Sequence, residues 1–280
     1  MLVGAARAGA QTLAVDSPRP PLPVLAALQA RLSPDAIHYG PSVGRYLIHR
    51  RLRVVQSYEG HPQTQDLGAR LFVSTVISGP ADSAGYPATF IIDSILPDSG
   101  LPPPVAEDIS KVRAVAFAGR LGPVGEFRSA AVAEGGLSHN VAQLVGGFRD
   151  FLPRIPAAGV HLGATWTDTL SVTQRAGGTE MRRHIVLHST AAAWEVHAGS
   201  RSLRIESTTT YRTEGSGLNG GQAFEINGTG TSSARAFLAE DGRFVGGETQ
   251  DSASLVITLP MQQLNIPVTQ LLQSSVVTLP

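Results

Sequence analysis

Residues 45–56 read RYLIHRRLRVVQ, and this stretch decides the fold class. Ile48 and Leu52 fall on one side of an extended chain, whereas Arg51 and Arg53 fall on the other. Because successive side chains of a β-strand point to opposite faces, this two-residue period predicts a strand with one buried face and one solvated face.

The same alternation recurs through most of the chain. Between residues 201 and 212, Leu203 and Ile205 alternate with charged side chains. Pairs such as Asp241-Gly242 separate the alternating segments, and both of these residues tolerate the positive φ of a two-residue hairpin turn. Strands are expected over residues 45–56, 70–78, 86–96, 112–120, 124–133, 165–174, 180–190, 201–212, 222–228, 232–239, 243–250, 252–259 and 266–277.

One long segment, residues 138–152, has helical spacing instead. Ser138 can cap it by accepting an unpaired backbone N–H, and apolar residues such as Leu144, Phe148 and Phe151 then follow three and four positions apart. A helix with one apolar face has to pack against another element. We therefore expect this helix to lie in the hollow of the sheet.

The predicted fold is mainly β: a large, curved, half-barrel-like antiparallel sheet with a few packing helices. The expected organisation is a truncated signal-peptide remnant (1–10), a linker with a short helix (11–39) and a single antiparallel β domain (40–280). Possible pseudo-repeats cover residues 40–135 and 160–280, joined by the helix at 138–152, and a further short helix is expected near 105–110.

The composition excludes several classes of site and partner. The chain has no cysteine, so it forms neither a disulfide framework nor a thiolate site. Its formal net charge is zero, which provides no long-range field to attract nucleic acid. No stretch approaches the ~18 consecutive apolar residues of a transmembrane helix, and no motif indicates a cofactor.

The N-terminal residues suggest export. Ala8-Gly9-Ala10 before Gln11 has the small-x-small pattern that signal peptidases cut after. We therefore expect an exported protein of the periplasm or cell envelope, with residues 1–10 as the remnant of a secretory signal.

Two glycine motifs lack the structural context that catalysis would need. Residues 40–44 spell G-x-S-x-G around Ser42, but a nucleophile elbow needs a helix after the serine, and a strand is predicted there. Residues 215–220 spell G-x-G-x-x-G, but the next segment is again a strand, so we interpret them as a hairpin loop. We expect no enzyme, and a serine hydrolase using Ser42 remains an alternative.

Three histidines and one aspartate are candidate site residues. His184 and His188 would share one face of a strand with His197 nearby, but neither cysteine nor paired carboxylates accompany them, so no metal site is predicted. Asp93 lies among isoleucines and is either a buried carboxyl with a raised pKa or a strand-end residue bonded to neighbouring backbone.

Arginines and tryptophans have simple interpretations. The arginines of residues 50–53 and the pair Arg182-Arg183 can bind an anionic head group, but a solvated sheet face is the favoured interpretation. Trp166 and Trp194 are expected in the core or at its rim.

A short segment carries a resemblance to known proteins. Residues 152–156 read LPRIP, and Gly163 and Trp166 follow. This segment resembles an LP-x-x-P-V-x-x-G-x-x-W segment of exported proteins built of long antiparallel strands. More loosely, the layout of residues 40–280 is similar to the lipoprotein-carrier and mycobacterial lipid-carrier families. The resemblance implies a half-barrel sheet around an apolar cavity, although this chain lacks the lipid-anchoring cysteine that some of those carriers have.

These observations lead to an expected function. The chain is expected to be a non-catalytic protein that binds a lipid or other hydrophobic small molecule in the concavity of its sheet. A structural or assembly protein of the cell envelope, with an envelope protein as its partner, is the alternative. The residues expected to line the ligand site, because their spacing predicts inward faces, are Ile92, Leu144, Phe148, Phe151 and Leu203.

Overall fold

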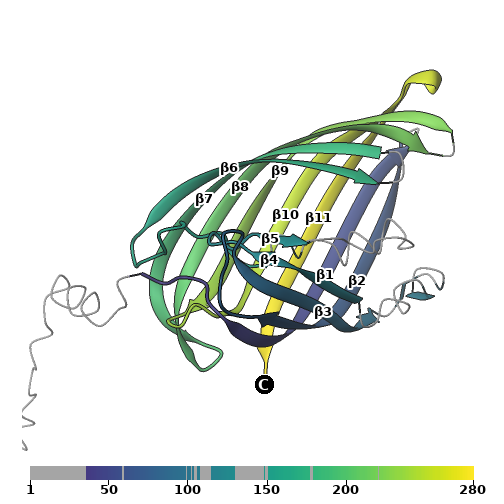
Figure 1. Ribbon diagram of the computed structural model, residues 1–280. Helices are drawn as coiled ribbons and strands as arrows, with labels where there is room; N and C mark the ends of the chain where they lie inside the picture. The colour runs from purple at the N-terminus through teal and green to yellow at the C-terminus, as the bar shows by residue number, and fades with distance from the viewer. Residues whose placement is uncertain are drawn as a thin grey trace, which may run out of the picture. The chain divides into compact units, whose positions relative to one another are not determined.

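The framework of the protein is one antiparallel sheet, seen in a computed structural model (Figure 1). Residues Pro34–Pro280 form one compact unit. The structure describes residues 36–280 except 59, 99, 102, 104–105, 108–114, 130–147, 149–150, 177–178 and 220. The predicted signal remnant, nearly all of the predicted linker, Leu144, and most of the predicted helices at 105–110 and 138–152 lie outside the described residues.

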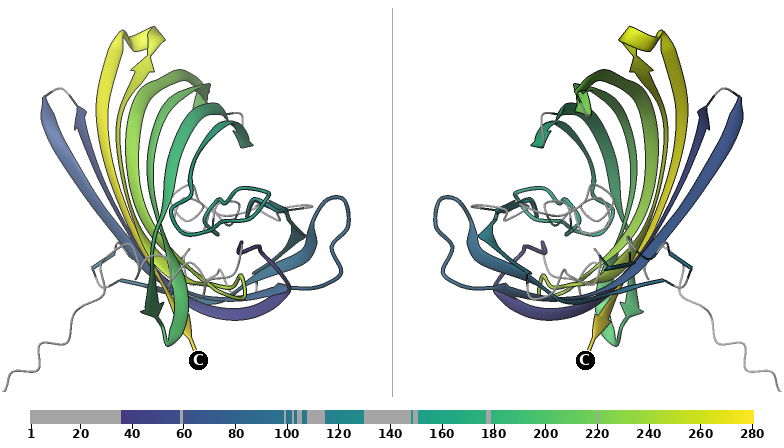
Figure 2. Two further views of the ribbon diagram at one scale, coloured as in Figure 1. Left: turned by 90° about the vertical axis from the view of Figure 1, so that its left-hand side faces the viewer. Right: turned by 90° about the vertical axis from the view of Figure 1, so that its right-hand side faces the viewer.

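Eleven strands lie in the order β5-β4-β3-β2-β1-β11-β10-β9-β8-β7-β6, and the sheet is not closed. Figure 2 shows it bending into an open half-barrel, so the predicted fold class is confirmed. The strands are β1 (Ser42–Tyr58), β2 (His61–Ile77), β3 (Tyr86–Pro97), β4 (Val115–Leu121), β5 (Phe127–Ser129), β6 (Thr165–Ala176), β7 (Thr179–His197), β8 (Ser200–Asn219), β9 (Gln222–Ala239), β10 (Phe244–Leu259) and β11 (Leu264–Leu279).

The topology consists of two meanders placed side by side. Strands β1 to β5 pair in sequence order, as do β6 to β11, and the pairing of β1 with β11 joins the two series. The series occupy the two predicted half-domains, whose origin as a repeat stays a prediction. Within the described residues helices contribute almost nothing, and η2 (Pro260–Gln262) is a single turn between β10 and β11.

Two predicted strand breaks are wrong. The segments 222–228 and 232–239 form one strand, β9, and the segments 243–250 and 252–259 form one strand, β10. Gly230 does not interrupt β9 because the ring of Tyr211, its partner on β8, covers it. A Cβ at Gly230 would lie 2.2 Å from Cζ of that ring, so the glycine provides space for a cross-strand aromatic side chain.

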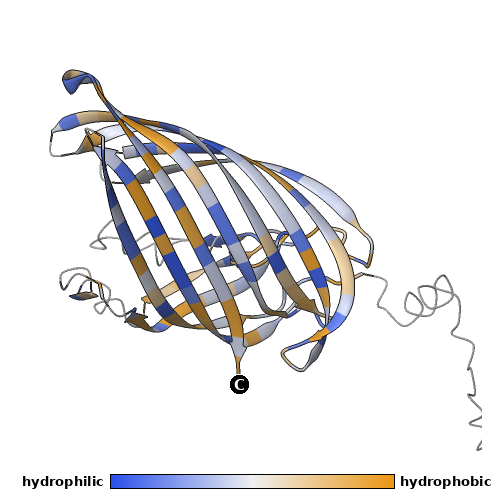
Figure 3. Ribbon diagram, turned by 180° about the vertical axis from the view of Figure 1, so that it is seen from behind, coloured by the Kyte–Doolittle hydropathy of each residue, from blue (hydrophilic) through white to orange (hydrophobic). Residues whose placement is uncertain are grey.

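The two faces of the sheet differ in what they contact. We call the face that residues 151–164 pack against the inner face, and the opposite face the outer face (Figure 2). As predicted, Ile48 and Leu52 of β1 are buried on the inner face, whereas Arg51 and Arg53 are exposed on the outer face. Figure 3 shows this alternation along the strands as bands of opposite hydropathy.

The core lies between the inner face and the segment that follows β5. Its centre is aromatic: the ring of Phe90 lies 5.5 Å from that of Phe148 and 5.6 Å from that of Phe151, measured between centroids. Phe151 also contacts Tyr46 at 5.3 Å and Phe244 at 5.4 Å, both edge-on. Strands from both meanders are therefore held around one inserted segment, as edge-to-face aromatic packing favours.

Polar contacts fix that segment in place. The hydroxyl of Tyr39 donates to the carbonyl of Pro153, and Ile37 and Val160 form an antiparallel bridge. Arg154 pairs with Asp168 of β6 at 2.6 Å, with 15% of the Arg154 side chain exposed. These contacts tie the segment before β1 and the first strand of the second meander to the same insertion.

Candidate functional site

Beyond the core, the inner face of β1 and β6–β11 continues toward the hairpins β1–β2, β6–β7, β8–β9 and β10–β11. Its side chains remain mainly apolar, and most are half-buried. Their sequence neighbours on the outer face are mostly Ser, Thr, His and Arg. We call this surface the distal inner face, defined by the apolar side chains Val54, Leu170, Ile185, Leu187, Leu255 and Leu272. Val54 and Leu272 form its border with the core, against which they pack.

The register places these side chains on one surface. Leu52, Leu272, Asp251, Ser232, Thr209 and Leu187 lie in one row across the sheet. Val54, Gln270, Ala253, Gly230, Tyr211, Ile185 and Leu170 lie in the next row toward the hairpins. Because directly opposed residues of antiparallel strands share a face, these side chains form one surface across seven strands, in which polar residues such as Ser232, Thr209 and Gln270 lie among the apolar ones.

A cluster of hydrogen-bonded polar side chains lies on the distal inner face. The hydroxyl of Tyr211 donates to Oδ1 of Asp251 at 2.7 Å, and the guanidinium of Arg183 lies 4.5 Å from the centroid of the Tyr211 ring. Nε of Arg183 donates to Oγ1 of Thr213 at 3.3 Å. Tyr211 and Thr213 are buried and Asp251 is half-buried, whereas Arg183 is exposed. The cluster therefore fixes the guanidinium of Arg183 in position on a mainly apolar surface.

Burial determines the electrostatics of this cluster. It raises the pKa of the Asp251 carboxyl, against the lowering effects of the Tyr211 hydrogen bond and the Arg183 charge. Burial and the bond to Asp251 also raise the pKa of Tyr211, so its hydroxyl stays protonated and serves as a donor. At the border with the core, burial lowers the pKa of Arg50 to about 10, which leaves that guanidinium charged at neutral pH.

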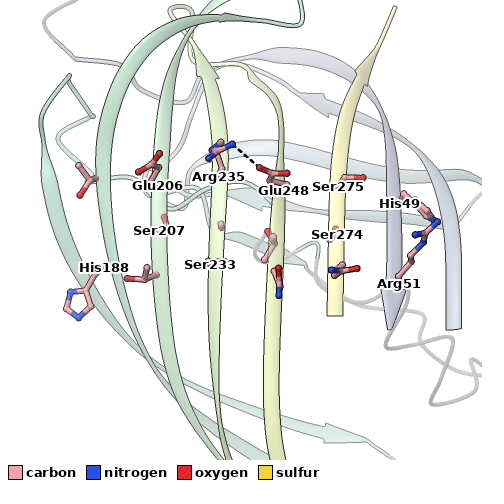
Figure 4. A pocket seen from close by; sticks show the side chains of 16 residues that line it. His49, Arg51, His188, Glu206, Ser207, Ser233, Arg235, Glu248, Ser274 and Ser275 are labelled. Atoms are coloured by element: carbon pink, nitrogen blue, oxygen red, sulfur yellow. Dashed lines mark hydrogen bonds and ion pairs between the residues drawn. The ribbon is translucent and has the colours of Figure 1, made fainter. Parts of the chain in front are cut away.

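The outer face carries a polar hollow of about 880 Å³ that crosses the strands from β7 to β1. Figure 4 shows its side chains in rows on the outer face, contributed by β7, β8, β9, β10, β11 and β1. They include His188, Glu206, Arg235, Glu248 and Arg51.

The charges of the outer hollow have partners close by. Arg235 pairs with Glu248 at 3.1 Å, as the dashed line in Figure 4 marks. His49 and Arg51 both face Asp98, at 3.0 and 3.8 Å. A hollow lined by hydroxyls and by charges paired among themselves is a solvated surface, and it offers no uncompensated group to a ligand.

The outer histidines bind neighbouring hydroxyls. Nδ1 of His188 lies 2.9 Å from Oγ1 of Thr167, and Nδ1 of His184 lies 2.9 Å from Oγ of Ser171. The ring of His197 stacks on Phe237. Within the described residues, no group of three or more His, Asp or Glu side chains is arranged to hold a metal ion.

Four of the residues expected to line a ligand site lie in the packed core. Ile92, Phe148, Phe151 and Leu203 are buried there, between 0% and 9% exposed, while Leu144 is outside the described residues. The spacing predicts their inward direction, and they do point inward. Spacing carries no information on where along a strand the core ends, so the more distal residues were missed.

The sequence does contain a signal for the cluster of Arg183, Tyr211 and Asp251, which the spacing argument missed. In β7, Arg183 is two and four positions before Ile185 and Leu187, so all three point to the same face. In β10, Asp251 is likewise two and four positions before Ala253 and Leu255. A charged residue at a position where the two-residue alternation predicts an apolar one indicates a polar group on a mainly apolar face. The interpretation of Arg182-Arg183 as one solvated group overlooked this, because adjacent strand residues point to opposite faces.

The remaining candidate residues from the sequence have no surroundings that indicate a site. Ser42 is the first residue of β1, and the described residues bring neither a histidine nor a carboxylate into hydrogen-bond contact with it. Asp93 is exposed at an irregularity in the pairing of β2 with β3, where it accepts a hydrogen bond from Ser74 at 2.6 Å. Trp166 and Trp194 pack against the core, as expected.

The G-x-G-x-x-G motif belongs mainly to β8 and leads directly into β9, so no helix follows it. In the described part of the chain, no helix is both long and apolar enough to cross a membrane. No family model matches the chain, and the comparison with curated proteins returned no match.

Proposed function

We propose that this protein is a non-catalytic protein of the periplasm or cell envelope that binds a lipid or other hydrophobic small molecule on its distal inner face. The observation that carries the proposal is the difference between the two faces beyond the core: the inner face, on the concave side of the sheet (Figure 2), has mainly apolar side chains, and the outer face has mainly hydroxylic or charged ones. Export is supported by the Ala8-Gly9-Ala10 pattern.

Energetics favour an apolar occupant on the concave side. Six half-buried aliphatic side chains there gain free energy when the remaining water is displaced, at roughly 25 cal/mol per Å² of apolar surface. An acyl chain is flexible and narrow enough to follow a curved sheet. The outer hollow has no comparable apolar surface and its charges are paired, so it does not compete as a site for such a ligand.

The test combines native mass spectrometry of gently purified protein with titration of the neutral fluorescent probe N-phenyl-1-naphthylamine. We expect co-purified lipid or saturable probe binding. Ile185→Asp should weaken probe binding about tenfold or more, since one buried aliphatic side chain contributes roughly 1.5–3 kcal/mol. Val186→Asp is the matched control: the same charge at the next residue, on the outer face, should leave probe binding unchanged.

Protein that carries no lipid and binds no probe contradicts the proposal, and would favour a structural or assembly role in the cell envelope. Equal effects of the two substitutions would show that the probe does not bind on the distal inner face.

A further inference from the structure

We propose that the distal inner face is selective for amphiphiles with an anionic head group, a carboxylate or a phosphate, and that Arg183 binds this head group. The inference rests on the proposed function and specifies its ligand class. Its basis is the position of one exposed guanidinium among aliphatic side chains on the concave side of the sheet.

The two adjacent arginines of β7 have different surroundings. Arg182 points to the outer face, where it pairs with Glu180 at 3.5 Å. Arg183 points to the inner face, and among the described residues no carboxylate lies within ion-pair distance of it. Asp251, the acidic group of the same cluster, binds the hydroxyl of Tyr211 instead.

Arg183 is held in position before any ligand arrives. Its Nε bonds to Thr213, and its guanidinium plane lies against the Tyr211 ring, whose hydroxyl is in turn bonded to Asp251. Stacking on an aromatic ring leaves the edge of a guanidinium available, and that edge matches a carboxylate or phosphate with two parallel hydrogen bonds. A cation that is already oriented loses little conformational entropy on binding an anion.

The neighbouring residues determine where the rest of the ligand lies. Ile185 and then Leu187 follow Arg183 on the same face of β7, at successive steps of about 6.4–6.8 Å along the strand. Leu170 lies beside Ile185 on β6. An acyl chain attached to a head group at Arg183 would contact these side chains as it extends toward the core.

The experiment compares decanoate with 1-decanol, two ligands of equal chain length, by displacement of N-phenyl-1-naphthylamine at pH 8. We expect decanoate to bind roughly tenfold or more tightly than the alcohol, as one charge-assisted contact implies. Decyl phosphate should also bind more tightly than the alcohol. Acetate and inorganic phosphate alone should not displace the probe, which distinguishes an amphiphile site from a simple anion site.

Arg183→Gln should remove the preference for the anion, so that decanoate and 1-decanol displace the probe with equal affinity. Arg182→Gln, the outer-face neighbour, should keep the preference. Equal affinities of decanoate and 1-decanol for the wild-type protein, or a preference that persists in Arg183→Gln, would overturn this inference while leaving the proposed function intact. Absence of probe binding by the wild-type protein would contradict both.

Discussion

Replacing Gly230 by alanine should destabilise the protein, although the backbone at this position is ordinary extended strand. In an open strand position, Gly→Ala would stabilise by about 0.5–1 kcal/mol, because alanine restricts the unfolded chain. Here the new Cβ would lie 2.2 Å from Cζ and 2.3 Å from Oη of Tyr211, so the ring has to move. Its movement would break the hydrogen bond to Asp251 and the stacking of Arg183.

The magnitude follows from these two contacts. A hydrogen bond to a carboxylate contributes about 1.5–3 kcal/mol, and a partly exposed cation–π contact about 0.5–1 kcal/mol. After subtraction of the favourable backbone effect, we expect Gly230→Ala to lower the free energy of unfolding by about 1.5–3 kcal/mol. Urea unfolding with an unchanged m-value measures this quantity.

A double-mutant cycle with Tyr211→Ala isolates the cause. Once the ring is removed, Gly230→Ala should become neutral or stabilising. Gly40→Ala, where a Cβ would meet no atom within 4 Å, serves as a control and should change stability by less than about 0.5 kcal/mol. The reasoning is refuted if Gly230→Ala destabilises equally with and without the tyrosine, or if it is harmless in the wild-type protein.

Three further predictions concern the core, the inserted segment and pH. Phe90→Ala should lower the free energy of unfolding by about 3–5 kcal/mol in urea, because the fully buried ring lies at the centre of the aromatic core; a change below 1 kcal/mol would contradict that packing. Arg154→Leu should lower it by about 1–3 kcal/mol, since Asp168 loses a partly buried partner, and Asp168→Asn in the same background should add little. The folded state raises the pKa of Asp251, so between pH 3.8 and the raised pKa it binds more protons than the unfolded state. This carboxyl therefore makes the free energy of unfolding fall as pH rises through that window. Urea unfolding of Asp251→Asn at a series of pH values should lack this fall, and pH profiles identical to the wild-type protein would refute it.

Local pattern was enough for much of the fold. The alternation in residues 45–56 identified β1 and its buried face, because pleat geometry couples sequence parity to direction. Asp241-Gly242 marked a real turn, since Gly242 has a positive φ and Asp241 accepts a bond from the backbone of Arg243. Local pattern failed at Gly230, where a glycine that resembled a strand break is covered by a ring from the neighbouring strand.

The candidate site depended on information that lies outside any local window. Residue parity could assign Arg183 and Asp251 to the inner face, but the contact of both with Tyr211 requires the register of β7, β8, β9 and β10. The boundary between packed core and open concave surface was likewise invisible, because it depends on where the inserted segment stops. That position is set by contacts such as those of Phe151 with Tyr46 and Phe244, two residues 198 positions apart, and a chain acquires such contacts only when the two meanders close around one core.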